Sequence, residues 1–276
     1  MYRFDISLSD YIMRFSNNEL IDKQYERRIL FKLAKKPFSS KQYRLLNFVN
    51  SLSISKDSNI LDFGTGTGYL VALLRFSGYS NTIGVDIKKN KSWDAIEYLF
   101  LDNETIFTEY NGKDLPFPDE LFNAVVSNQV LEHVNDVESY FSESARTLKS
   151  DSRSMFNFPH RIQLYDTHSQ TWFVHYFPKH IRRFLYGIFA ELSPDYYEGL
   201  LNLRSPKYYV NIANKYFEKV KDVSLDRLNS GVDLNTYEGN KTLRLLVQKI
   251  FEIPFIGKYV MKGLSYMSEL SLIVQK

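Results

Sequence analysis

Apolar and polar positions follow two different spacings along the chain, and the first is the spacing of a helix. In residues 1–55 apolar side chains recur at helical spacing, as at Leu45 and Val49. Ser39 or Ser40 is placed to cap the helix that carries them. We therefore expect an N-terminal helical cap over residues 1–55.

From Asn59 onward, short apolar runs alternate with helix-length segments. The apolar runs predict five strands, at residues 60–63, 82–85, 105–107, 124–126 and 155–158. Helices are predicted between them at residues 67–77, 91–99 and 136–149. This succession is typical of crossover connections in a parallel sheet. We predict an α/β fold, with its ligand site outside the carboxyl ends of the strands.

Residues 160–205 interrupt this alternation with an aromatic-rich stretch that holds four of the five histidines. We interpret it as an insertion after the fifth strand, most simply a substrate lid. A dimer surface or a membrane-surface helix stays open, because Lys179, Arg182 and Arg183 are mixed with large aromatics. The C-terminal part is predicted to contain a helix over residues 205–220, a strand-like run over residues 221–228, helical material around residues 240–264, and a last strand in SELSLIVQK. We assign residues 56–276 to one domain.

Composition excludes several classes of protein. Hydrophobic residues make up 44% and charged residues 24% of the chain, as expected of a globular protein. The net charge is +3 and no basic block stands out, so a nucleic-acid partner is not expected. The chain has no cysteine, which excludes disulfides and thiolate metal sites. Neither a secretory signal nor an 18-residue apolar run is visible, so we expect a cytoplasmic protein.

The stretch NILDFGTGTG, residues 59–68, places Gly64, Gly66 and Gly68 directly after the first predicted strand. Glycine there permits a tight turn and a close approach of a ligand to the backbone. No Gly-Lys-Ser/Thr follows, which argues against a P-loop, and the spacing is one residue short of the dinucleotide-binding pattern. A glycine-rich turn by itself does not identify its ligand.

Asp62, just before the turn, distinguishes the remaining possibilities. Two unit negative charges about 4 Å apart repel by about 4 kcal/mol at an effective dielectric constant of about 20, so Asp62 opposes a pyrophosphate. S-adenosylmethionine carries a sulfonium and an ammonium group, and an acid beside them is favourable. Asp86, at the end of the next strand, can accept both ribose hydroxyls, as in NAD sites, and so does not discriminate.

Four motifs in order resemble those of a known family: ILDFGTGTG, GVDI, LPFPDELFNAVVSNQVLEHV and ESARTLKS. They are similar to the class I S-adenosylmethionine-dependent methyltransferases of the small-molecule branch, over about residues 55–158. The resemblance implies a Rossmann-like fold, with a mostly parallel seven-stranded sheet and helices on both faces. Two departures are Asn123, where the family has aspartate, and LKSDS, where it has LKPGG.

The resemblance also implies which residues hold the cofactor, S-adenosylmethionine. Asp62 and the turn that includes Thr65 would hold its methionine end, and Asp86 its ribose. The remaining assignments are Ile87 on the adenine face, Asn111 and Gly112 at the adenine amino group, and Asn128 and Gln129 through backbone and side-chain contacts. Asn111 replaces the family's acid, but its amide oxygen can accept the same hydrogen bond.

The acceptor determines whether catalysis needs a base. Much of the rate can come from holding donor and acceptor in line, but a hydroxyl acceptor must lose a proton. His133, His160 and His168 are the candidates for this base; Asp166 beside His168 would raise its basicity. The spacings of eight, seven and five between the last four histidines do not place ligands on one helical face, so we predict no metal site.

The sequence thus predicts a cytoplasmic S-adenosylmethionine-dependent methyltransferase of a small molecule, such as a sugar or glycan precursor, acting as a monomer or homodimer. A lipid or quinone methyltransferase in contact with a membrane surface is the alternative within this class. A nicotinamide-dependent oxidoreductase and a non-catalytic cofactor-binding protein are the alternatives from other classes.

Overall fold

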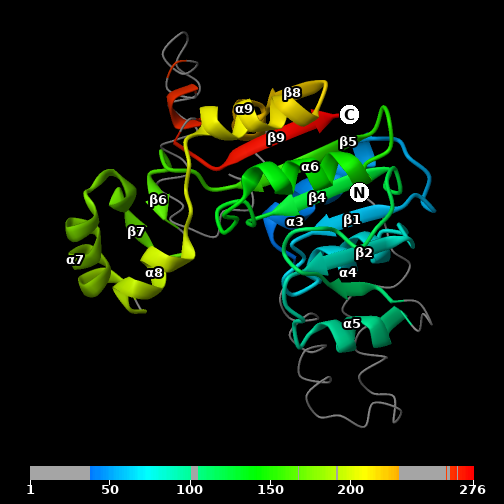
Figure 1. The fold of residues 1–276 in the computed structure, drawn as a ribbon, viewed down its shortest axis with the longest axis horizontal. Coiled ribbons are helices and arrows are strands. Elements are labelled where there is room, and N and C mark those ends of the chain that lie inside the picture. The colour runs from blue at the N-terminus through cyan, green and yellow to red at the C-terminus, as the bar shows by residue number, and fades with distance from the viewer. Residues whose placement is uncertain are drawn as a thin grey trace. The chain divides into compact units, whose positions relative to one another are not determined.

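The computed structural model describes residues 38–100, 105–166, 168–190, 192–229, 259, 262–265 and 267–276. It contains a seven-stranded sheet with the strand order β3-β2-β1-β4-β5-β9-β8 and a two-stranded sheet of β6 and β7 (Figure 1). The predicted mostly parallel, seven-stranded sheet is confirmed. The chain divides into two compact units, one of residues 1–126 and 147–149, the other of residues 127–146 and 150–276.

The elements of the first unit begin with a helix that is capped as predicted. They are α3 (Ser40–Ser51), β1 (Ile60–Phe63), α4 (Tyr69–Phe76), β2 (Thr82–Asp86), α5 (Trp93–Phe100), β3 (Phe107–Glu109) and the start of β4 (Ala124–Asn128). Ser39 and Gln42 form a reciprocal capping box at the start of α3. Residues 1–37 of the predicted helical cap lie outside the described residues.

Parallel pairing in this unit follows from strands that are buried on both faces. All four residues of β1 are buried, and β1 pairs in parallel with β2 and β4. The third strand lies two residues later than its apolar run, 105–107, suggests. It occupies the sheet edge, where the polar side chains of Thr108 and Glu109 can extend the pairing with β2 at no burial cost.

The elements of the second unit are the end of β4, α6 (Val137–Thr147), β5 (Arg153–Phe158), β6 (Tyr165–Asp166), β7 (Thr171–Trp172), the 3₁₀ helix η1 (Val174–Tyr176), α7 (Lys179–Phe189), α8 (Pro194–Leu200), α9 (Pro206–Tyr216), β8 (Lys219–Asp222), α10 (Ser224–Asn229) and β9 (Leu270–Gln275). The predicted final strand is β9, which pairs antiparallel with both β5 and β8 (Figure 1). The segment between residues 160 and 205 holds β6, β7, η1, α7 and α8.

Two local predictions in this unit have a different outcome in the structure. The strand-like run of residues 221–228 is a strand only to Asp222, because the Asp222 carboxylate accepts the N–H of Ser224 at 2.9 Å and α10 begins there. The turn before β5 lacks the family's glycines, and Asp151 takes the left-handed conformation instead, with φ of 60°. The helical stretch expected at residues 240–264 lies almost wholly outside the described residues.

Candidate functional site

The turn after β1 has the backbone that its glycines permit. Gly64, Gly66 and Gly68 have φ values of 81°, 52° and 76°. A Cβ at Gly66 would meet no heavy atom within 4 Å, whereas one at Gly68 would lie 2.5 Å from the ring of Phe107. Gly66 therefore presents bare backbone to open space, as a ligand cradle requires, while Gly68 is needed for packing.

Asp62 is a buried carboxyl group whose pKa lies near neutral pH. Its side chain lies at the end of β1, 2% exposed, and accepts a hydrogen bond from the Thr65 hydroxyl at 2.7 Å. Burial raises the pKa of Asp62 to about 7; the Thr65 hydrogen bond opposes this shift and the charge of Asp86 adds to it. A positive charge brought beside Asp62 would lower this pKa and be stabilised by the carboxylate.

Asp86 connects the glycine turn to the end of β2. Its carboxylate accepts the N–H of Gly66 through Oδ2 and the N–H of Ile87 through Oδ1, both at 2.7 Å. The Asp86 carboxylate thus takes up the Gly66 N–H, which would otherwise be available to donate to an anionic ligand. A carboxylate has about four lone-pair directions, so two remain for other donors such as ribose hydroxyls.

The three residues predicted to contact adenine lie at the ends of β2 and β3. Ile87 is 62% exposed, unusual for its size, and a Cβ on Gly112 would lie 3.3 Å from it. Asn111 uses its amide oxygen to accept the N–H groups of Lys113 and Asp114, both at 2.8 Å. Because that oxygen is engaged in a turn, the Nδ2 group is what Asn111 offers a ligand.

The sequence interpretation missed two residues that brace the glycine turn from the start of α5. The hydroxyl of Ser92 donates to the carbonyl of Thr67 at 2.6 Å, and the indole N–H of Trp93 donates to that of Gly66 at 2.9 Å. Trp93 is 3% exposed and stacks on Phe107. No local pattern marks this role, because both side chains bond carbonyls of a segment more than twenty residues earlier.

Asn128 and Gln129 lie at the end of β4, in the second unit. Gln129 has a left-handed backbone, with φ of 59°, and its N–H donates to the carbonyl of Asn157 at 2.8 Å. The buried Asn128 Oδ1 and Gln129 Nε2 have no hydrogen-bond partner among the described residues. Buried polar atoms of this kind point to a bound ligand or water.

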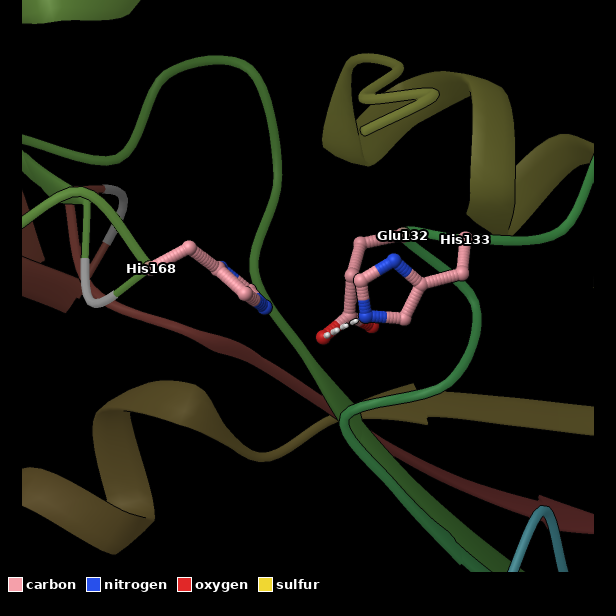
Figure 2. Close-up of side chains that lie close together, drawn as sticks. All are labelled: Glu132, His133 and His168. Atoms are coloured by element: carbon pink, nitrogen blue, oxygen red, sulfur yellow. Dashed lines mark ion pairs between the residues drawn. The ribbon is translucent and has the colours of Figure 1, made fainter. Parts of the chain in front are cut away.

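The structure brings two of the three candidate bases together, with an acid that the sequence interpretation did not select. His133 and His168 have ring centroids 5.2 Å apart, and His133 Nε2 lies 3.8 Å from the Glu132 carboxylate. Figure 2 shows both imidazoles pointing toward that carboxylate. Glu132 is fully buried, while His133 and His168 are 35% and 21% exposed.

His160 is separate from this pair in its contacts. It is 1% exposed, its Nδ1 accepts the N–H of Ile162 at 3.2 Å, and it hydrogen-bonds the backbone of Ser268. Burial lowers the pKa of His160 to about 4. With its ring nitrogens engaged inside the protein, His160 has the environment of a packing residue, so its predicted role as a base gains no support.

Asp166 organises the turn that carries His168. Its Oδ1 accepts the N–H of His168 at 3.0 Å and lies 3.4 Å from His168 Nδ1, and its Oδ2 accepts the Ser169 hydroxyl at 2.6 Å. Burial raises the pKa of Asp166, but these hydrogen bonds and the charge of His175 outweigh burial and hold it below its usual range. The predicted Asp166–His168 pair is present.

A pocket of about 300 Å³ lies among the elements of residues 160–205. Its described lining contains no acid and consists of Arg161, His175, Arg182, Tyr186, Tyr197, Leu201, Leu203 and Arg204. The N–H of Arg161 donates to the carbonyl of Arg204 at 3.0 Å, which holds two of the arginines side by side. Arg183, also a candidate for binding an anion, instead forms an ion pair with Asp195. The pocket has the charge and size for an anionic small molecule.

Comparisons with known proteins agree with this geometry. The model of a family described as "methyltransferase domain" matches residues 61–156. Over 102 residues the chain is 31% identical to the uncharacterized methyltransferase YcgJ of Bacillus subtilis, covering 35% of this chain and 39% of the relative. Over 114 residues it is 29% identical to the demethylmenaquinone methyltransferase of Tropheryma whipplei, covering 40% and 47%. The chain thus spans less than half the length of both relatives.

Solved structures extend the likeness to the whole fold. Geranyl diphosphate C-methyltransferase from Streptomyces coelicolor superposes with a TM-score of 0.51 at 14% identity, covering 95% of this chain and 86% of that one. An S-adenosylmethionine-dependent methyltransferase from Mesorhizobium loti gives a TM-score of 0.50 at 14% identity, covering 83% and 96%. Likeness at this identity concerns the fold. Over residues 61–156 the match to the methyltransferase-domain family agrees with the predicted class, the class I S-adenosylmethionine-dependent methyltransferases.

Proposed function

We propose that this chain transfers a methyl group from S-adenosylmethionine to a small-molecule acceptor that carries an anionic group, such as a phosphorylated or nucleotide-linked sugar. The observation that carries the cofactor assignment is the hydrogen bond from the Gly66 N–H to the Asp86 carboxylate. Bound S-adenosylmethionine supplies an electrophilic methyl group on a sulfonium, and the protein supplies position and charge.

The electrostatics of the glycine turn favour a cationic cofactor over a dinucleotide. In dinucleotide sites the pyrophosphate takes the backbone N–H groups at this turn. Here Asp86 holds the N–H of Gly66, and the Asp62 carboxyl lies buried beneath the same turn. A pyrophosphate would have to displace one carboxylate and approach another, whereas a sulfonium or ammonium group is attracted to both.

The residues present fit S-adenosylmethionine. We propose that Asp62, Thr65 and the turn of residues 64–68 hold its methionine end, where Gly66 faces open space. Asp86 retains lone pairs for the ribose hydroxyls, and the exposed Ile87 beside Gly112 offers an apolar face to adenine.

Asn111 would donate to a ring nitrogen of adenine through Nδ2, because its oxygen is already engaged. Contacts of Asn128 and Gln129 with the cofactor stay a prediction from the resemblance; their buried Oδ1 and Nε2 atoms have no hydrogen-bond partner among the described residues.

The arginine pocket supports an anionic acceptor. Arg161, Arg182 and Arg204 line one pocket whose described lining has no acid. Guanidinium forks bind phosphate oxygens in pairs, which fixes orientation as well as charge. Tyr186 and Tyr197 in the same lining stack on each other and form a packed wall of the pocket. We propose the segment of residues 160–205 as the acceptor-binding part of the chain.

Proton removal, where the acceptor requires it, is assigned to the His133–His168 pair. His168 is oriented by Asp166, whose Oδ1 lies 3.4 Å from His168 Nδ1. A carboxylate acceptor would need no base.

Calorimetric titration tests the cofactor assignment. We expect S-adenosylmethionine and S-adenosylhomocysteine to bind and NADH not to bind. Asp86→Ala should weaken S-adenosylmethionine by about 1.5–3 kcal/mol, the value of hydrogen bonds to a charged group. Asp57→Ala, which removes an exposed acid of the same unit, is the matched control and should change nothing. NADH binding in the absence of S-adenosylmethionine binding would establish the oxidoreductase alternative instead.

Labelled methyl transfer tests the acceptor assignment. Cell-extract small molecules are fractionated by charge and incubated with the protein and methyl-labelled cofactor, and the labelled product is identified. We expect label in the anionic fraction, lost at least tenfold in Arg161→Gln and retained in Arg153→Gln, an exposed arginine outside the pocket. Cofactor that binds tightly and is never consumed would favour the non-catalytic alternative.

A lipid or quinone acceptor at a membrane surface is the second candidate. Helix α7 exposes Phe184 and Phe189 by 67% and 66% beside its basic residues, the composition of an interfacial helix. The matched relative from Tropheryma whipplei is a demethylmenaquinone methyltransferase. Among the described residues no helix has the length and apolarity to cross a membrane. Co-sedimentation with anionic vesicles that Phe184→Ser abolishes would support this candidate. Oligomeric state and cytoplasmic location stay predictions.

A further inference from the structure

Three metal-ligand side chains meet in the second unit, outside the glycine turn. Glu132 and His133 follow β4, and His168 follows β6. Each offers one ligand atom, and these atoms all lie within 4.8 Å of one another. Figure 2 shows the two imidazoles directed at the carboxylate from separate segments. We propose that Glu132, His133 and His168 bind a divalent transition-metal ion, with Zn²⁺ as the best match.

The donor set selects the metal. Two imidazoles and one carboxylate form a recurrent three-ligand set for Zn²⁺, which leaves a fourth position open for water or substrate. Nitrogen ligands favour Zn²⁺ and its first-row neighbours, whereas Mg²⁺ and Ca²⁺ prefer oxygen ligands throughout. Bonds of about 2.0–2.1 Å in a tetrahedron place the ligand atoms about 3.3 Å apart, so binding requires a modest closure. The partly exposed His133 and His168 can supply that closure by rotating toward the buried Glu132.

The environment of the ligands matches that of a metal site. Asp166 Oδ1 lies 3.4 Å from His168 Nδ1, which leaves Nε2 for the metal. Metal-ligating histidines almost always contact a carboxylate or carbonyl through the other ring nitrogen. The loop that carries Glu132 is tied to the segment after α8, because the backbone carbonyl of Glu132 accepts the N–H of Asn202 at 2.6 Å.

This inference departs from the expectation that the chain binds no metal. That expectation considered the spacings among the last four histidines only. The proposed ligands combine one of those histidines with a Glu–His pair from a distant segment, a combination that spacing does not reveal. None of its ligands is a residue proposed to hold the cofactor. A bound metal would replace the assignment of His133 and His168 as a base, because an imidazole nitrogen that ligates a metal has no lone pair left to accept a proton.

Metal titration of the purified full chain, stripped with a chelator, tests the proposal. We expect one equivalent of Zn²⁺ to bind by calorimetry and one equivalent of Co²⁺ to give the visible spectrum of a site with nitrogen ligands. His168→Gln and Glu132→Gln should each weaken Zn²⁺ at least tenfold. Asp166→Asn, which removes the orienting carboxylate, should weaken it by about 10–100-fold. His180→Gln is the matched control: it removes an exposed imidazole and should leave binding unchanged.

Several outcomes would overturn the proposal. They are no binding at micromolar Zn²⁺, equal binding by the His168→Gln and His180→Gln variants, or selective binding of Mg²⁺. Circular dichroism of each variant separates lost binding from lost folding, and His133→Gln replaces Glu132→Gln should the latter unfold. S-adenosylmethionine affinity, measured in the same samples, reports on the proposed cofactor site separately, so either hypothesis can fail without the other.

Discussion

The glycine turn of residues 64–68 and the segment of residues 160–205 are both candidate functional regions, but they are built differently. The turn is fixed by the next strand and helix along the chain, through hydrogen bonds from the Gly66 N–H to Asp86 and from the Trp93 indole to the Gly66 carbonyl. The segment has its own small core of Val174, Tyr186 and Tyr197. A site built on a strand–turn–helix unit can be recognised from a sequence motif. A site built on the core of an inserted segment can be recognised only from the folded structure.

The largest expected effect distinguishes two glycines within the turn. Gly68→Ala should destabilise the chain by about 2–5 kcal/mol, because its Cβ would overlap Phe107 at a backbone that already disfavours side chains. Gly66→Ala should cost about 1–2 kcal/mol, because only the positive φ opposes it. Urea unfolding measures both. Equal losses would show that the turn does not divide into a packing glycine and a ligand-facing one.

The inserted core should respond locally. Val174→Ala removes two buried methyl groups and should weaken this core by about 2 kcal/mol. Phe184→Ala, at a side chain 67% exposed, is the control and should have little effect. Hydrogen exchange of α7 amides measures the change where it occurs. Global loss of protection in Val174→Ala would mean that the segment is not an independently packed part.

The turn should show a pH dependence that the inserted segment lacks. Burial raises the pKa of Asp62 to about 7, and a bound cation lowers it, so binding releases a proton below pH 7. Affinity for S-adenosylmethionine should therefore fall about tenfold between pH 8 and pH 6 through this group. Asp62→Asn should remove this component, and the ligand's own ammonium titration affects both proteins equally. Parallel pH profiles would exclude Asp62 as a partner of the cofactor's charge.

The carboxyl of Asp62 also affects stability, with the opposite trend from an ion-paired acid. Its folded pKa is raised above the unfolded value of 3.8, so the folded state binds the proton more tightly. Stability should therefore fall as pH rises from about 4 to 7, and the cost is fully present above pH 7. Asp62→Asn should flatten this fall, as denaturant unfolding at pH 5 and pH 8 would show.

The smallest effect concerns a turn where the chain departs from its family. Asp151→Gly should stabilise the protein by about 0.5–1 kcal/mol, because glycine adopts the φ of 60° without strain. Ser152→Gly, at a position without positive φ, should be neutral or destabilising. Denaturant unfolding compares the two. A loss of stability in Asp151→Gly would indicate a side-chain role for Asp151.

Much of the fold was predictable because local patterns carry it. The strands β1, β2, β4 and β5 lie where their apolar runs place them, and Ser39 caps α3 as expected. The exceptions, β3 and α10, depend on an exposed sheet edge and on the side chain of Asp222, which apolar periodicity does not report. Of the site, the acids and glycines were found, but Ser92 and Trp93 were not, since their role is to satisfy carbonyls of another segment.

The sequence by itself determined the class of the domain and the charge of its glycine turn, because a strand, a turn and the acids at two strand ends are set by neighbouring residues. Only the tertiary structure decided that His160 packs inside while His133 and His168 meet at Glu132, and that Arg161, Arg182 and Arg204 line one pocket. Such groupings depend on how distant segments pack against each other, and the spacing of residues along a chain does not contain that information.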